Sequence, residues 1–414
     1  MTEEKRKNIR AVISYINSTK NEIEIDVWRY AALNIDPRNY GYLPRPTAWI
    51  SKLGKYKVLL PILAFFWRIF FSFLFVIISY IRAITKYYFS NYNRHVPNRF
   101  ATVAVAVAPR SIDVIHGLLG NANYNWLVAP WIDKTQIDDQ NRVIDIYSLI
   151  HIKDLNRIFY LSFFSLRCSS KRIPRRWSLQ LYTSFNWFLI YLALDKCSGD
   201  LITSEHYDRF AVLVDSVSQR RMASSKLTLI QHGIVTDPTN KQIDQSAFVP
   251  PTKLFFVKNL YVYDEQSKEY FMQNILNSKH SPIAINYFRP ELRLSDIPFD
   301  NEPSVLFVGN SISISLHLYL LKELKKKFNF NAYYKPHPTE KIGNLITRAE
   351  WIVIQDRSFF PRVNFLITYP STLINEYAHL NIKSFTHAIN LSIGDSSEYQ
   401  SLVERELKLF SEDY

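Results

Sequence analysis

The chain has 414 residues, and its 50 lysines and arginines against 37 aspartates and glutamates give a formal net charge of +13 at pH 7. Hydrophobic residues make up 47% and aromatic residues 15%, which excludes a disordered chain and allows one large core or two ordinary ones. The two cysteines exclude a disulfide framework or a four-cysteine zinc site and favour a reducing compartment.

This basic balance predicts an anionic partner, and nucleic acid, a membrane surface and a phosphorylated ligand are the candidates. No helix-turn-helix, zinc-finger or RNA-binding aromatic signature occurs in the sequence, so we expect no nucleic-acid partner. The first ten residues are mostly charged and no apolar segment follows them closely, so we expect no signal peptide.

The longest apolar segment runs from 58 to 81, and its only charged residue is Arg68. It is long enough to cross a bilayer, but Pro61 near its start and Arg68 toward its middle count against a span. Basic residues flank both ends, so the positive-inside rule gives no orientation. An interfacial helix, a buried helix and a true span remain open; we favour the interfacial helix, held by apolar burial and by anionic lipid.

Beyond the apolar segment, short strand-like runs alternate with helical segments in two blocks, at 99–276 and 304–414. Such alternation predicts two α/β domains with parallel sheets. The stretch 277–303 carries prolines and no clear period, and we interpret it as a linker. Residues 1–98 form an N-terminal extension that contains the apolar segment.

In the second block, the sequence YYKPHPTEK holds His337 between two prolines directly after a strand, with Lys335 two positions earlier. An imidazole fixed at a strand end, ahead of a helix, is placed to donate to a phosphate oxygen. A proline-rich turn with an incidental histidine is the alternative.

Two further turns of this block carry small polar residues. Ser371 and Thr372 precede a helix, where hydroxyls and free amides can hold a phosphate, and Glu376 follows one turn later, able to accept from ribose hydroxyls. Asn310 and Ser311 begin a similar turn that could form a third side of the pocket. An ordinary helix cap and a plain connection are the alternatives, and the spacings of dinucleotide-binding and P-loop motifs are absent.

The first block places polar residues after two successive strands, in SEHYD and QHG. Glu205 and His232 at these positions are candidates for the general base that deprotonates an acceptor hydroxyl. A capping cluster or a satisfied core histidine is the alternative for each. The basic loop 167–177 is either a solvated surface or a contact with a membrane or an acidic acceptor.

A first block with QHG, followed by a second with KPHP and YPST…NE, resembles the GT-B glycosyltransferases of bacterial surface polysaccharide assembly. Within them it is most similar to capsule enzymes with CMP- or CDP-activated donors: sialyl- and polysialyltransferases, Kdo transferases and glycerophosphotransferases. The resemblance covers roughly 101–414 and implies two Rossmann-like domains facing a cleft. It also implies that His337 and Pro338, and Ser371 with Thr372, hold the donor nucleotide. The acidic motif that supplies the base in polysialyltransferases is absent, and Glu205 is its substitute here.

We therefore expect an inverting, metal-independent glycosyltransferase without a cofactor. It would move a sialic, pseudaminic or Kdo-like sugar from a CMP-activated donor to a capsule or surface glycan, lipid-linked, at the cytoplasmic face of the inner membrane. The expected catalytic residues are Glu205, His232 and His337, and the expected nucleotide-binding residues are Lys335, His337, Pro338, Asn310, Ser311, Ser371, Thr372 and Glu376. A CDP-polyol phosphotransferase, a UDP- or GDP-sugar transferase of the same fold and a non-catalytic capsule assembly protein are the alternatives.

Overall fold

The fold is taken from a computed structural model of the chain. The residues that it describes are 2–53, 56–90, 101–120, 122–137, 139, 142–169, 171–221, 225–233, 248–277, 282–288, 292, 294–296, 302–310, 312–337, 342–356, 359–371 and 373–412.

The first domain is built on a seven-stranded parallel sheet with the strand order β3-β2-β1-β4-β5-β6-β7. Its strands are β1 (Thr102–Ala106), β2 (Asn125–Val128), β3 (Val143–Ile144), β4 (Asp200–Thr203), β5 (Leu227–Ile230), β6 (Val257–Val262) and β7 (Ala284–Tyr287). The chain leaves β1 toward β2 on one side and later returns to β4 on the other. This reversal creates a topological switch point, the place where open α/β sheets bind ligands.

Apolar runs form the central strands because helices cover both faces of the sheet. The helices of this domain are α5 (Pro109–Leu119), η5 (Lys134–Gln136), α6 (Ile152–Ser169), η7 (Arg175–Thr183), α7 (Ser184–Lys196), α8 (Arg209–Arg220), α9 (Glu265–Tyr270) and the π-helical η8 (Phe271–Ile275). Helix α7 is buried along nearly its whole length, as a helix that is apolar all round must be.

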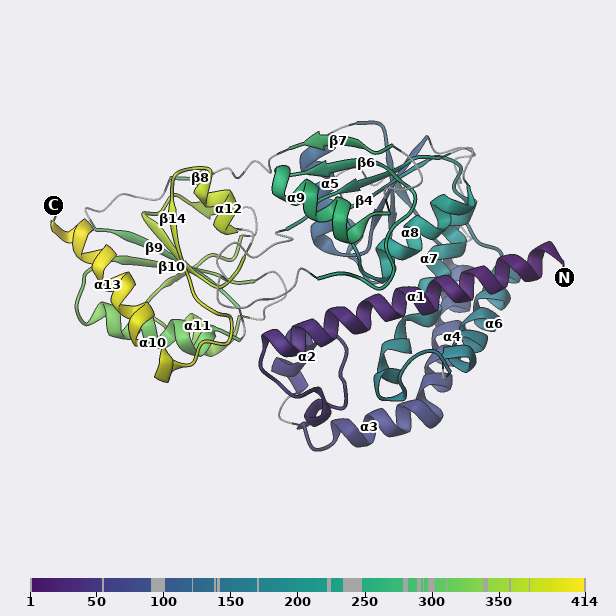
Figure 1. The fold of residues 1–414 in the computed structure, drawn as a ribbon, viewed down its shortest axis with the longest axis horizontal. Helices are drawn as coiled ribbons and strands as arrows, with labels where there is room; N and C mark the ends of the chain where they lie inside the picture. The colour runs from purple at the N-terminus through teal and green to yellow at the C-terminus, as the bar shows by residue number, and fades with distance from the viewer. Residues whose placement is uncertain are drawn as a thin grey trace.

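The long N-terminal helix α1 (Glu3–Ala32) packs against α8 and α6 and joins the core of the first domain. Its apolar side contributes buried residues such as Tyr15 and Tyr30. Its polar side is also buried: the Asn21 amide donates to the Tyr207 and Thr252 carbonyls, both at 2.9 Å. Figure 1 shows α1 running along the right-hand lobe, where it belongs to the first domain rather than to a separate extension.

The apolar segment forms one continuous helical stretch that packs on the outside of the first domain. After η1 (Pro37–Tyr40) and α2 (Pro46–Leu53) come α3 (Leu60–Phe66), the π-helical η3 (Trp67–Phe71) and α4 (Ser72–Ser90). One side of α4 packs on α6, with Val76 and Ala83 buried and the Phe73 and Phe163 rings 4.8 Å apart. The helix from 60 to 89 is long and apolar enough to cross a membrane, yet little of it is buried.

The second domain carries a five-stranded parallel sheet with the order β11-β10-β9-β13-β14. Its elements are β8 (Leu294–Ser295), β9 (Ser304–Val308), α10 (Ile314–Lys325), β10 (Asn331–Lys335), α11 (Asn344–Thr347), β11 (Ile352–Val353), β12 (Phe360–Pro361), β13 (Phe365–Thr368), α12 (Leu373–Ala378), β14 (Lys383–Thr386), η10 (Ile393–Asp395) and α13 (Ser397–Glu412). Two apolar clusters fill its two faces, and its switch point lies between β9 and β13, where the strand order reverses.

These two parallel sheets confirm the predicted α/β fold of two Rossmann-like domains with an N-terminal helical segment. Within the expected linker 277–303, the described residues include the strands β7 and β8. Strand β7 is the edge of the first sheet, and β8 pairs with β12 in the second domain. Figure 1 shows the two lobes side by side, with the second domain in yellow-green.

Candidate functional site

The switch point of the first sheet brings together residues from two strand ends. Arg110 and Ser111 follow β1 at the start of α5, and Glu205 follows β4. The Ser111 hydroxyl donates to Glu205 Oε1 at 2.8 Å, and Arg110 Nη2 lies 3.6 Å from Glu205 Oε2. Glu205 is buried, whereas 58% of the Arg110 side chain is exposed. The buried carboxylate therefore holds a guanidinium group that is open to a ligand.

Glu205 forms a coupled pair with Asp208, the residue that caps α8 by accepting from the Phe210 and Ala211 amides. Burial raises the pKa of Glu205, but its hydrogen bond with Asp208 and the positive charge of Arg110 outweigh burial and leave that pKa below its ordinary value. Burial and the Glu205 charge raise the pKa of Asp208 well above its ordinary value. At neutral pH, Glu205 is therefore the ionised member of the pair.

His232 is held in one tautomer. Its Nδ1 donates to the Ser204 carbonyl, which can only accept, so Nε2 carries the lone pair. His206 Nε2 accepts from the His232 backbone N–H at 2.7 Å, and the two rings lie 4.0 Å apart. Burial, and then the charge of Arg110, lower the pKa of His232 to about 4. The ring is neutral at pH 7 with an acceptor nitrogen available.

The other members of QHG fix this turn. The Gln231 amide nitrogen donates to the Gly233 carbonyl and to Ser267 Oγ, both at 3.1 Å, and its oxygen accepts from the Tyr263 amide at 2.8 Å. Gly233 adopts φ +80, in the left-handed region that favours glycine. Its N–H donates to the Tyr263 hydroxyl at 3.1 Å. The contacts of Gln231 and Gly233 thus fix the backbone on both sides of His232.

On the second domain, Lys335 lies at the end of β10 and is directed to the neighbouring loop. Its Nζ donates to the Asp356 and Phe359 carbonyls at 3.2 and 2.7 Å, and it stands 4.1 Å from the Phe360 ring centroid. Burial lowers its pKa to about 8. Lys335 thus contacts the carbonyls of Asp356 and Phe359, and its expected role in nucleotide binding stays a prediction.

His337 follows β10 and remains solvent-accessible. Partial desolvation by the protein around it, and then the charge of Arg110, lower its pKa. Arg110 belongs to the first domain, so its charge acts on His337 from the other domain. Burial raises the pKa of Tyr263 to about 12, and the charge of Glu376 adds to that rise.

The remaining expected residues of the second domain have local partners. Ser371 Oγ accepts from the Leu373 amide at 3.4 Å, so it caps the six-residue helix α12. Asn310 Oδ1 accepts from the Ile312 amide at 2.9 Å. Burial raises the pKa of Glu376 to about 7. The expected residues Ser311, Pro338 and Thr372 lie outside the described residues.

Sequence reasoning did not single out Arg110, Ser111 or Tyr263. The first two follow the first predicted strand, so the rule that selected SEHYD and QHG could also have selected them. Tyr263 ends another strand-like run and carried no distinguishing signal. Within the described ranges no three His, Cys, Asp or Glu side chains gather as metal ligands would, and metal independence stays a prediction.

Comparisons with known proteins add little to this geometry. No family model and no curated protein matches the chain. Among solved structures, the crystal structure of Acinetobacter baumannii MurG matches with a TM-score of 0.35 and 11% sequence identity, covering 73% of this chain and 82% of that one. The function is therefore argued from the site itself.

We expect the Glu376 carboxyl to make stability depend on pH. With its pKa raised to about 7, the folded chain keeps a proton that the unfolded chain releases near pH 4.5, so the free energy of unfolding falls as pH rises between these values. Glu376→Gln lacks this fall. It should raise the thermal midpoint at about pH 8 and leave it unchanged at about pH 4.

The matched control is Glu269→Gln, which changes an exposed glutamate on α9. Thermal unfolding of the three proteins across this pH range is the measurement. A Glu376→Gln variant with the pH dependence of the wild type would show that the carboxyl titrates normally.

Proposed function

We propose that this chain is a GT-B glycosyltransferase that binds a nucleotide-activated sugar between its two domains. The observation that carries the proposal is the cluster at the switch point of the first sheet, where the buried Glu205 carboxylate holds the exposed Arg110 guanidinium and the Ser204 carbonyl fixes the tautomer of His232. The first sheet thus supplies the Arg110 guanidinium group and the neutral His232 imidazole with a fixed lone pair. The second sheet supplies the accessible His337 imidazole. Together they suit a reaction with a departing phosphate and a hydroxyl nucleophile.

In the proposed reaction, His232 Nε2 takes the proton from the acceptor hydroxyl. The acceptor oxygen forms a bond to the anomeric carbon as the bond from that carbon to the phosphate oxygen breaks, and the electron pair leaves with CMP. Attack opposite the leaving group inverts the anomeric centre. Arg110 and His337 stabilise the negative charge that grows on the phosphate, an electrostatic contribution of the kind that dominates such catalysis.

Of the two expected bases, the structure favours His232. Both oxygens of the buried Glu205 carboxylate are engaged, one by Ser111 and the other by Arg110. His232 Nδ1 donates to the Ser204 carbonyl, which leaves Nε2 as the acceptor nitrogen. We assign Glu205 the positioning of Arg110. Glu376, with a pKa of about 7, stays the proposed ribose contact, and a CMP-nonulosonate stays the proposed donor because its carboxylate and phosphate suit the Arg110 edge.

We also propose that the helix from 60 to 89 lies in the membrane interface without crossing it. Its inner side packs on α6, and Trp67 donates to the Ser178 carbonyl of η7 at 3.2 Å. Its outer side faces solvent and is mainly apolar, although Arg68, Arg82 and Lys86 are also exposed. The hydrophobic residues with at least half of their surface exposed are Ile62, Leu63, Phe65, Ile69, Phe70, Ile81, Tyr88 and Phe89 on the helix, and Val58 and Leu59 just before it. A helix with protein along one side and an apolar opposite side suits monotopic binding at an inner-membrane surface, near a lipid-linked acceptor.

We expect His337→Ala to lower turnover by a factor of about 10² to 10³, because one preorganised donor to the leaving phosphate is lost. CMP should raise the thermal midpoint of the wild type more than CDP, UDP or GDP does, and should act weakly on the variant. His379→Ala, an exposed histidine of the same domain, is the control.

Wild-type CMP binding and turnover in His337→Ala would remove this residue from the site. A stronger response to CDP would favour the polyol phosphotransferase, and a response to UDP or GDP a different sugar donor. Binding of CMP without turnover of any CMP-sugar would indicate the non-catalytic protein.

The two base candidates separate by kinetics. His232→Ala should lower kcat by a factor of about 10² to 10⁴ and leave CMP binding unchanged, since it removes only the proton acceptor. Glu205→Gln should act mainly on donor KM, because it releases Arg110. Release of CMP from CMP-sialic acid, followed as a function of donor concentration, measures both. A collapse of kcat in Glu205→Gln, with His232→Ala active, would return the base role to Glu205.

The interfacial helix predicts that both of its flanks lie on one side of the membrane. With the two native cysteines replaced by alanine, Glu24→Cys and Lys86→Cys should both react with a membrane-impermeant thiol reagent in everted vesicles and neither in intact cells. Both positions are exposed in the structure. Labelling from opposite sides would mean a true span.

A further inference from the structure

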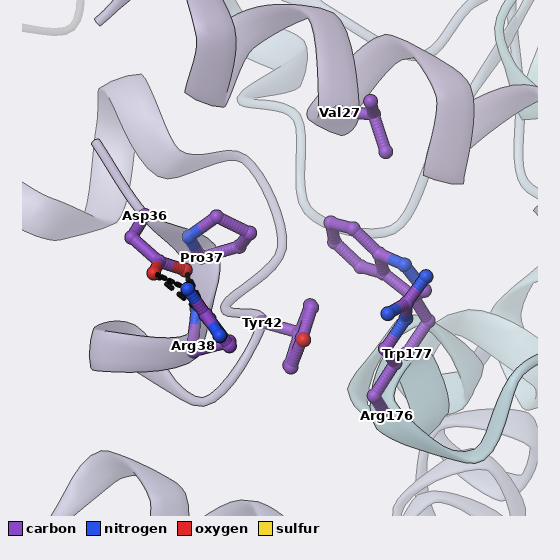
Figure 2. Close-up of a pocket in the computed structure, with 7 residues that line it drawn as sticks. All are labelled: Val27, Asp36, Pro37, Arg38, Tyr42, Arg176 and Trp177. Carbon is purple, nitrogen blue, oxygen red and sulfur yellow. Dashed lines mark hydrogen bonds and ion pairs between the residues drawn. The ribbon is translucent and has the colours of Figure 1, made fainter. Parts of the chain in front are cut away.

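A cavity of about 330 Å³ lies between α1, η1 and η7, apart from the site described above. Val27, Pro37, Tyr42 and Trp177 form its apolar walls, and Arg38 and Arg176 bring guanidinium groups to it (Figure 2). The volume is near the lower end of the range for small-molecule sites, about 300 to 1,000 Å³.

The charges around this cavity leave a positive excess. Asp36 is paired with Arg38, whose Nη2 stands 2.7 Å from Asp36 Oδ2, and hydrogen bonds from Arg38 lower the pKa of Asp36. Arg176 lies over the Tyr42 ring at 5.5 Å from its centroid, and no carboxylate of the described residues forms an ion pair with it. One carboxylate thus faces two guanidinium groups.

The walls of the cavity are fixed before any ligand enters. Trp177 is buried and packs edge-on against Tyr42, with the ring centroids 5.0 Å apart. Gly41 adopts φ +59, and a Cβ at this position would stand 2.7 Å from the Leu60 carbonyl oxygen. This close approach holds the loop that carries Tyr42 against the first turn of α3. The cavity is therefore linked to the apolar helix through η1 and η7, which carry lining residues and pack against α3.

The cavity also adjoins a basic stretch at the start of η7, in which Lys171 and Arg172 of the preceding loop and Arg175 of η7 are exposed. An apolar helix on one side and a basic stretch on the other define the level at which lipid phosphates lie in a bilayer. From the sequence, this stretch is either a solvated surface or a contact with a membrane or an acidic acceptor.

We propose that this cavity binds the phosphate head group of an anionic membrane phospholipid. Arg176 donates to the phosphate, and Tyr42, Trp177 and Val27 contact the glycerol and the first methylene groups. The inference rests on the membrane placement in the proposed function and not on its donor chemistry. A lipid held here fixes the orientation of the first domain on the bilayer.

The test compares Arg176→Ala with Arg175→Ala, which removes the same charge from the next residue, outside the cavity lining. Flotation of the full chain with phosphatidylcholine vesicles, with and without phosphatidylglycerol, measures the preference for anionic lipid. Arg175→Ala should weaken this preference about fivefold, the contribution of one basic residue near the surface. Arg176→Ala should weaken it about tenfold more, because it also loses a charge-assisted hydrogen bond.

At high salt the effect of Arg175→Ala should vanish and that of Arg176→Ala should persist, since only diffuse attraction is screened. Val27→Phe, which fills the cavity without changing charge, should also lose the preference for phosphatidylglycerol while keeping its binding to neutral vesicles. CMP binding should be unchanged in all three variants.

If Arg175→Ala and Arg176→Ala lose the same share of the preference for anionic lipid at both salt concentrations, the inference is overturned. Diffuse electrostatic attraction would then explain the binding by itself. Full lipid preference in Val27→Phe would overturn it as well, and so would displacement of the vesicles by inorganic phosphate. None of these outcomes bears on donor binding or turnover, so a failure here is distinct from a failure of the glycosyltransferase proposal.

Discussion

The buried guanidinium group of Arg209 connects the N-terminal helix to the edge of the first sheet. It donates to the Gln180 carbonyl at 3.0 Å, and its Nη2 lies 3.6 Å from Glu22 Oε2 on α1. A fully buried cation is tolerated only with such partners. Arg209 directly follows Asp208, so the contacts of Arg209 also fix the position of Asp208 and of its pair with Glu205. The geometry of the candidate site thus depends on α1.

The candidate site separates its charges by burial. Glu205 is buried and holds an exposed guanidinium group, while His232 is kept neutral by its surroundings. The buried Glu205 carboxylate therefore fixes the position of the Arg110 guanidinium group. The second domain also combines a buried and an exposed basic residue. Lys335 is buried and donates to two loop carbonyls, whereas His337 is accessible. Residue type alone does not show whether a side chain holds its neighbours or is open to a ligand. The distances to neighbouring atoms show the difference.

Much of the fold was predictable because buried parallel strands read as short apolar runs between helical segments. Edge strand β7 was not, since its residues are half-buried or exposed and carry no apolar run. The strand ends could also be predicted from the sequence. Glu205 in SEHYD and His232 in QHG both follow a strand, as expected. The role of Arg110 depends on a partner 95 positions away in the chain, an association that only tertiary structure creates. The contacts of Lys335 with two loop carbonyls likewise depend on tertiary structure.

Helix α1 has 30 residues, a length of about 45 Å at 1.5 Å per residue. Along it, Asn21 and Asp26 make hydrogen bonds in the polar core, and the next residue, Val27, lines the cavity between α1, η1 and η7. The stretch from 21 to 27 covers about two helical turns, so a rotation about the helix axis moves both of its ends together. The cavity and the polar contacts of α1 with the first domain are consequently linked through one stiff helix.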